Sequence, residues 1–139
     1  MASQIGTATR NNLIEQVKVL TRTASTDFIA EQFVGSTSGQ ALPLAPAAVV
    51  EGLCLQDINA STTPDYAVAG ELMCDGFDKT IDRFLVTVTG TATKAMEQSD
   101  FDISAGDAGT IDVSAPGTQF KLERFISPTL CEFSVLLTA

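Results

Sequence analysis

From residue 28 to residue 137, apolar and polar side chains alternate in short runs with a period of two. In the clearest run, Phe84, Val86 and Val88 point one way while Thr87 and Thr89 point the other. This alternation predicts a strand with one buried face, because successive side chains of a strand lie on opposite faces. Similar runs predict about eight short strands, over residues 28–34, 49–55, 66–72, 84–89, 101–103, 111–113, 119–125 and 131–137.

Two of these runs depart from simple alternation. Both faces of residues 49–55 are largely apolar, which is typical of a central strand. After Leu122 the alternation slips, because Phe125 is apolar where a polar residue is due. The slip predicts a β-bulge near residues 123–124.

The segments between these runs are rich in glycine, proline, serine and aspartate, which are typical of loops and turns. We predict such connections over residues 35–39, 57–65, 75–78 and 127–129. Residues 92–98 allow one helical turn at most. The fold class expected is therefore all-β, a small barrel or sandwich of about eight short strands with an extended N-terminal arm.

The N-terminal residues differ in charge from the rest of the chain. Residues 1–22 hold three basic and one acidic side chain, a net charge of +2, whereas residues 23–139 hold five basic and sixteen acidic ones, a net charge of −11. The first segment is also rich in threonine, serine and asparagine. We predict an N-terminal arm over residues 1–26, followed by a β domain over residues 27–139.

Within the arm the apolar pattern fits two conformations. Leu13, Val17 and Leu20 would share one face of a helix. Val17, Val19 and Thr21 would equally share one face of a strand. The pattern alone does not decide, although the valine and threonine content favours a strand.

The amino-acid composition excludes several classes of function. The 139 residues include 45% hydrophobic and 18% charged side chains, with a net charge of −9 and no histidine. The length suits one domain with a real core. Without histidine, Ser-His-Asp catalysis and His-ligated zinc are excluded. The negative charge argues against nucleic acid or anionic lipid as a partner. No stretch approaches the roughly 18 apolar residues of a membrane span, and we see no secretory signal.

The three cysteines are Cys54, Cys74 and Cys131, and they form no Cys-x-x-Cys motif. We interpret them as reduced thiols that act as small hydrophobic side chains. A disulfide between two of them, or one reactive thiol, is the alternative.

One acidic cluster suggests calcium binding. Asp100, Asp102 and Asp107 resemble the start of a calcium loop. However, Ala105 stands where such a loop needs glycine, and Ile111 stands where it needs a bidentate acid.

A second acidic cluster suggests hydrolysis. Asp75, Asp78 and Asp82 follow one another closely, and paired carboxylates can cleave glycosidic bonds. A sugar cleft usually has aromatic walls, but the chain has one tyrosine and no tryptophan. We interpret the first cluster as a solvated strand face and the second as carboxylates that pair with the nearby Lys79 and Arg83. We therefore predict a protein that is not an enzyme, with no catalytic residue, metal or cofactor. A small ligand- or calcium-binding β-barrel stays an alternative.

The mean hydropathy of the chain is +0.21, which is high for an acidic protein with few charges. Two explanations are open. Apolar side chains on the surface would mark a protein–protein contact. A well-filled core in a threonine-rich β protein would give the same average.

Four segments carry a resemblance to a known family. After the arm come Val49–Asp57, a polar loop and Gly70–Gly76, and near the end come Gly117–Glu123 and Cys131–Leu137. In this arrangement the chain, over residues 28–138, resembles the head decoration, or cement, proteins of tailed bacteriophages.

The resemblance implies a structural virion protein, assembled in the host cytoplasm, that binds the outside of the capsid and clamps neighbouring subunits of the major capsid protein. It also implies self-association, as a trimer or less often a dimer. The residues expected at these interfaces lie in the arm and in a proline-stiffened segment after it: Ile5, Thr7, Arg10, Asn12, Leu13, Val17, Leu42, Pro43, Leu44 and Pro46. A tail or fibre assembly subunit of a phage is the alternative.

Overall fold

The computed structural model describes residues 9–10, 16–80, 82–137 and 139. In these residues the chain forms eleven strands and one short 3-10 helix, η1. Their bounds are β1 Thr9–Arg10, β2 Val17–Thr21, β3 Phe33–Thr37, β4 Gln40–Pro43, β5 Val49–Cys54, β6 Glu71–Asp75, β7 Phe84–Thr89, η1 Lys94–Met96, β8 Asp100–Ser104, β9 Asp107–Asp112, β10 Phe120–Ser127 and β11 Leu130–Val135.

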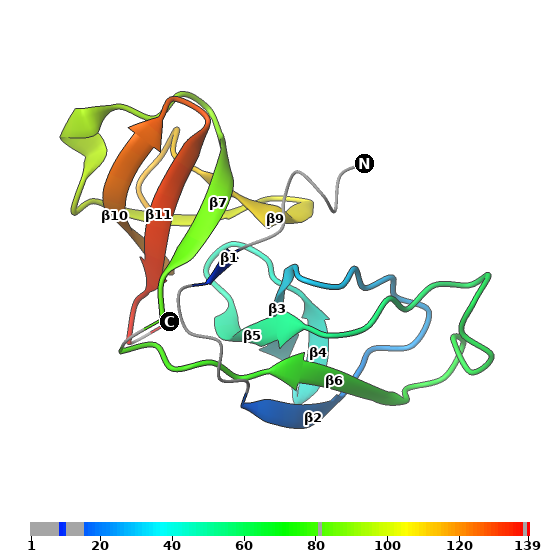
Figure 1. Cartoon of the computed structure of the whole chain (residues 1–139). Helices are drawn as coiled ribbons and strands as arrows, with labels where there is room; N and C mark the ends of the chain where they lie inside the picture. The colour runs from blue at the N-terminus through cyan, green and yellow to red at the C-terminus, as the bar shows by residue number, and fades with distance from the viewer. Residues whose placement is uncertain (1–8, 11–15, 81, 138) are drawn as a thin grey trace.

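The strands form a barrel and a separate sheet (Figure 1). The barrel has the order β7-β11-β10-β8-β9, and a parallel pairing between β9 and β7 closes it. The short β1 pairs with the first residues of β7. The sheet has the order β2-β6-β5-β3-β4 and is antiparallel throughout. The predicted all-β class is confirmed, with ten strands in the described barrel and sheet rather than about eight.

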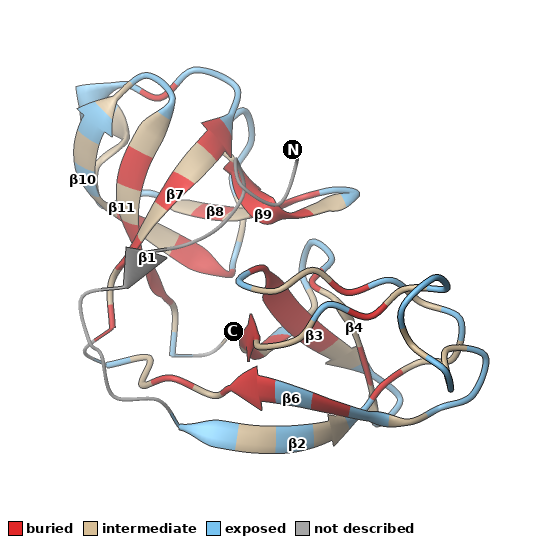
Figure 2. Ribbon diagram, turned by 45° about the vertical axis from the view of Figure 1, so that its right-hand side comes forward, coloured by how far each residue is buried: buried red, intermediate tan, exposed pale blue. Residues whose placement is uncertain are grey.

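One hydrophobic core joins the barrel to the sheet. Figure 2 shows buried residues on strands of both units. Phe33 of β3 stands edge-on to Phe84 of β7 and to Phe120 of β10, with ring centroids 5.4 and 4.9 Å apart. Such edge-to-face contacts are a favourable arrangement of aromatic rings. Because a side chain of the sheet enters the core of the barrel, the two units form one body.

A buried glutamine adds a polar link between the two units. Gln119, just before β10, is 1% exposed. Its Nε2 donates to the backbone oxygens of Ala45 and Ala48, both at 2.8 Å, and its Oε1 accepts from the N–H of Ile103 at 2.9 Å. These bonds satisfy the buried amide, as a protein interior requires. They join the loop before β5 to strand β8 of the barrel.

The opposite face of the sheet has a second, smaller core. It consists of Phe28, Val34, Ala41, Cys54, Ile58 and Leu72. Arg22, a fully buried arginine, lies beside this core, and its Nη2 donates to Oδ1 of Asp65 at 2.8 Å and to the backbone oxygen of the same residue at 3.1 Å. A Cβ on Gly70 would lie 2.7 Å from the guanidinium, so Arg22 needs glycine there. Arg22 therefore fixes the long loop between β5 and β6.

The prediction of a strand over residues 28–34 is right only at its end, and most of the glycine loop predicted after it is wrong. Strand β3 lies further along the chain, and the turn to β4 consists of Ser38 and Gly39, with φ values of 53° and 80°. Two positive φ values are typical of the type I′ turn that suits a β-hairpin. Gly35 lies inside β3, where an added Cβ would be 2.9 Å from Cδ1 of Leu44. This glycine therefore reflects close packing rather than a loop.

The prediction of a strand over residues 66–72 is wrong in its first part, because β6 begins at Glu71. The residues before it form turns. The backbone oxygen of Val68 there accepts from the guanidinium of Arg22. Backbone groups that bond to a distant side chain are not available to a strand ladder.

Other predictions of local structure are confirmed. Strand β7 has alternating burial along its length, and β5 lies between β6 and β3 as a central strand. The register of β10 against β11 shifts between Leu122 and Arg124, where the sequence predicts a β-bulge. Residues 92–98 contain a single 3-10 turn.

Part of the predicted arm belongs to the sheet. Strand β2 pairs with β6 over its whole length, from Val17 opposite Asp75 to Thr21 opposite Glu71. The strand interpretation of this segment is confirmed, and β2 is a member of the β body rather than of an arm.

Candidate functional site

Apolar side chains form a row on the exposed face of β2 and β6. Val17 and Val19 are 51% and 55% exposed, and Met73 is 42% exposed. Val19 stands directly opposite Met73 in the sheet register. The half-buried Leu55 extends the row, because its N–H donates to the backbone oxygen of Met73. We call Val17, Val19, Leu55 and Met73 the apolar strip. A contiguous apolar surface of this kind is typical of a contact site.

The apolar strip lies at an edge of the sheet. Among the described strands, none pairs with the outer side of β2, and a bridge to β4 begins only at Arg22. The backbones of Gln16 and Arg22 hydrogen-bond on the β6 side. Residues at odd positions between them, Val17 and Val19, therefore turn their N–H and C=O groups away from β6. An open edge of this kind can receive a further strand.

An ion pair ties the other face of β2, on which Lys18 lies, to the interior of the sheet. Nζ of Lys18 lies 2.9 Å from Oε1 of Glu51 on β5, and Oγ of Ser36 on β3 donates to the same carboxylate at 2.6 Å. The hydrogen bond from Lys18, followed by that from Ser36, lowers the pKa of Glu51 against the opposing effect of burial. Strand β2 is thus anchored across the sheet, and the apolar strip has a rigid backbone.

The predicted interface residues of the arm do not all lie in one part of the structure. Four of them lie outside the described residues, and their roles stay predictions: Ile5, Thr7, Asn12 and Leu13. Arg10 lies in β1, opposite Phe84 of β7. Val17 lies in the apolar strip next to Val19, which the sequence places on the same strand face but which was not among the predicted interface residues. Met73 gave no signal, because its place in the strip depends on the register of β6 against β2.

The predicted proline-stiffened contact segment is divided between surface and core. Leu42 and Pro43 are half-buried at the end of β4, and Pro46 is exposed. Leu44 is 2% exposed and belongs to the core between barrel and sheet. Its predicted place on a contact surface is therefore contradicted, because an apolar extended segment does not reveal which way each side chain points. The other three residues stay predictions.

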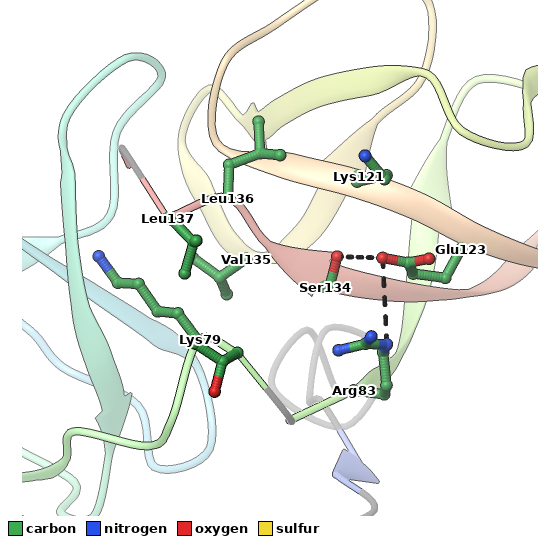
Figure 3. Close-up of a pocket in the computed structure, with 9 residues that line it drawn as sticks. Lys79, Arg83, Lys121, Glu123, Ser134, Val135, Leu136 and Leu137 are labelled. Carbon is green, nitrogen blue, oxygen red and sulfur yellow. Dashed lines mark hydrogen bonds and ion pairs between the residues drawn. The ribbon is translucent and has the colours of Figure 1, made fainter.

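A groove of about 480 Å³ lies between the loop before β7 and strands β10 and β11 (Figure 3). Lys79, Arg83 and Lys121, three of the eight basic side chains of the chain, line it. Glu123 accepts from Oγ of Ser134 at 2.5 Å and lies 4.0 Å from Nε of Arg83. The groove is thus a cationic feature on an acidic protein.

Lys79 is a half-buried cation of this groove. Burial lowers the pKa of its ammonium group, and the nearby carboxylate of Glu51 acts in the opposite direction. Its Nζ donates to the backbone oxygen of Ala139.

The acidic clusters make local hydrogen bonds. Asp78 accepts from the hydroxyl and the N–H of Thr80, and Asp112 accepts in the same way from Ser114. The hydroxyl first and the N–H second lower the pKa of each carboxyl. Within the described residues, no three Cys, Asp or Glu side chains are arranged to hold a metal ion. These carboxylates stabilise turns, as short polar side chains commonly do.

The three cysteines are free thiols in this structure and all are buried, so their predicted place in the interior is confirmed. Burial raises the pKa of all three thiols, that of Cys54 to about 11. The reactive thiolate form is therefore scarce at neutral pH.

No protein-family model matches the chain, and no curated protein matches it at a significant level. In the part of the chain that the structure describes, no helix has the length and apolarity needed to cross a membrane.

Proposed function

We propose that the protein is a structural, non-enzymatic virion protein that binds the outside of a phage capsid and clamps neighbouring subunits of the major capsid protein. The observation that carries this proposal is the open edge of β2, where Val17 and Val19 form the apolar strip with Met73. The resemblance of the sequence to phage decoration proteins supports the choice of the capsid as the partner.

The partner adds an extended segment to β2. Main-chain hydrogen bonds fix the direction of that segment, and the valines supply apolar contact. Completing the burial of a half-exposed valine contributes about 1 kcal/mol. Association itself costs about 4–15 kcal/mol, so one strip binds weakly. Self-association as a trimer or dimer would multiply this weak contact into firm attachment.

The rigidity of the body supports a clamping role. Phe33 and Gln119 join the sheet to the barrel, and the ion pair of Lys18 ties β2 to the sheet interior. A load applied at β2 is therefore carried by the whole body. The cationic groove offers a second contact, to an acidic group of a neighbouring subunit.

Binding to undecorated heads of the phage that encodes the chain tests the proposal. Wild-type protein is expected to co-sediment with the heads and to appear on their surface by electron microscopy. Val19→Lys is expected to weaken binding at least about tenfold, because a charge in a strip that binding buries opposes strand addition. Val68→Lys is the matched control, since Val68 is 56% exposed but lies in the loop before β6.

Two results would contradict the proposal. Equal binding by Val19→Lys and wild type would exclude the apolar strip as the contact surface. Failure of the wild type to bind heads, together with rings or fibres of the protein alone, would instead favour a tail or fibre subunit.

A further inference from the structure

Cys54 of β5 and Cys74 of β6 stand directly opposite each other in the sheet. The N–H and C=O of Cys54 bond to the backbone of residues 31–32, on the β3 side. The next residue, Leu55, instead donates its N–H to the backbone oxygen of Met73. The two cysteines are therefore a non-hydrogen-bonded pair of antiparallel strands.

A pair of this type has the geometry of a disulfide. Its Cα atoms are about 4.5 Å apart, and both side chains lie on the same face of the sheet. Disulfides form at Cα separations of about 4.4–6.8 Å. Burial is the main cause that raises the pKa of the Cys54 thiol to about 11, and the neighbouring Cys74 thiol contributes to the rise.

We propose that Cys54 and Cys74 are a site of reversible covalent modification. Exchange with a small-molecule disulfide such as oxidised glutathione joins the two cysteines in a stabilising cross-strand disulfide between β5 and β6. This proposal rests on the strand register and is independent of the proposed binding to capsids.

The chemistry is thiol–disulfide exchange. The thiolate of one cysteine attacks a sulfur of oxidised glutathione, which gives a mixed disulfide and releases one glutathione thiol. The thiolate of the other cysteine attacks the protein sulfur of that mixed disulfide and releases the second glutathione thiol. The two cysteines are oxidised, the glutathione disulfide is reduced, and both cysteine protons end on glutathione. Because both thiols are buried, the exchange occurs in locally opened molecules.

The disulfide would close the chain between β5 and β6. That stretch contains the long loop held by Arg22, and β6 carries Met73 of the apolar strip. Closing a loop of this length restricts the unfolded chain, and we expect the Tm to rise by about 5–10 °C.

Oxidation of the full-length protein tests the proposal. The protein is incubated with oxidised glutathione at about pH 8.5 and moderate urea, which raise the thiolate fraction and the local opening. The intact mass of the expected product shows the loss of two hydrogen atoms, and one of the three thiols remains. Its Tm is higher than that of the reduced protein, and dithiothreitol restores the lower Tm. Peptide mapping is expected to join Cys54 to Cys74.

Variants identify the pair. Cys131 is the matched control, because it is also buried but lies in the barrel on β11. Cys131→Ala is expected to form the disulfide, whereas Cys54→Ala and Cys74→Ala are not. Three remaining thiols in oxidised wild type, a disulfide that includes Cys131, or a fall in Tm on oxidation would each overturn the proposal.

Discussion

Replacing Gln119 by methionine tests how the barrel and the sheet are held together. Methionine has nearly the volume of glutamine, so the change removes three hydrogen bonds and leaves the packing almost intact. The N–H of Ile103 and the C=O of Ala48 lose these partners, whereas the oxygen of Ala45 keeps the bond from the N–H of Ala48. The N–H of Ile103 is buried, and leaving it unpaired costs about 1–3 kcal/mol. The C=O of Ala48 is only partly buried and costs less, so the free energy of unfolding is expected to fall by about 2–4 kcal/mol.

Urea denaturation followed by far-UV circular dichroism measures this loss. A domain is stable by about 5–15 kcal/mol, so the urea concentration at the midpoint of unfolding is expected to fall clearly. The Tm is expected to fall by about 10 °C. Gln98→Met is the matched control, because Gln98 is exposed, and it is expected to stay within about 0.5 kcal/mol of wild type. A loss below about 1 kcal/mol for Gln119→Met would refute the reasoning, since the two backbone groups would then be satisfied without the glutamine.

Two further changes have expected outcomes. Arg22→Met removes the guanidinium that holds Asp65, and the loop between β5 and β6 is expected to become the first site of limited proteolysis, as mass spectrometry of the fragments will show. The pKa of Glu51 is lowered in the folded protein, mainly by Lys18, so its contribution to stability is present above the ordinary value of 4.5 and is lost as the pH falls through the lower folded value. Glu51→Gln is therefore expected to be less stable than wild type at about pH 6 and to lose less stability on acidification, and equal urea midpoints at both pH values would contradict this.

Sequence pattern predicted those strands whose burial follows from their own residues. The alternation at Phe84, Val86 and Val88 is local, and so is the slip after Leu122, and both appear in the structure where they were expected. The prediction failed where a distant residue decides the conformation. The alternation near Val68 suggested a strand, but Arg22, far away in the sequence, holds that segment in turns.

The candidate site was predictable to a smaller degree. Val17 was expected at an interface and lies in the apolar strip, but Met73 joins the strip only through the pairing of β2 with β6. Leu44 was expected on the surface and lies in the core, because the direction of a side chain in an extended segment depends on what packs over it. Gln119 gave no signal, since its partners are backbone atoms, two of them in the loop before β5.

The core shared by barrel and sheet affects the order in which the molecule can mature. Strands β2 to β6 leave the ribosome before any strand of the barrel does. Phe33 and Leu53 belong to a core that the barrel mostly supplies, so on the nascent chain that face of the sheet is open to water. The first half of the protein therefore cannot complete its core until the second half has been translated. During that interval, chaperones or rapid translation and folding protect the exposed apolar face from aggregation.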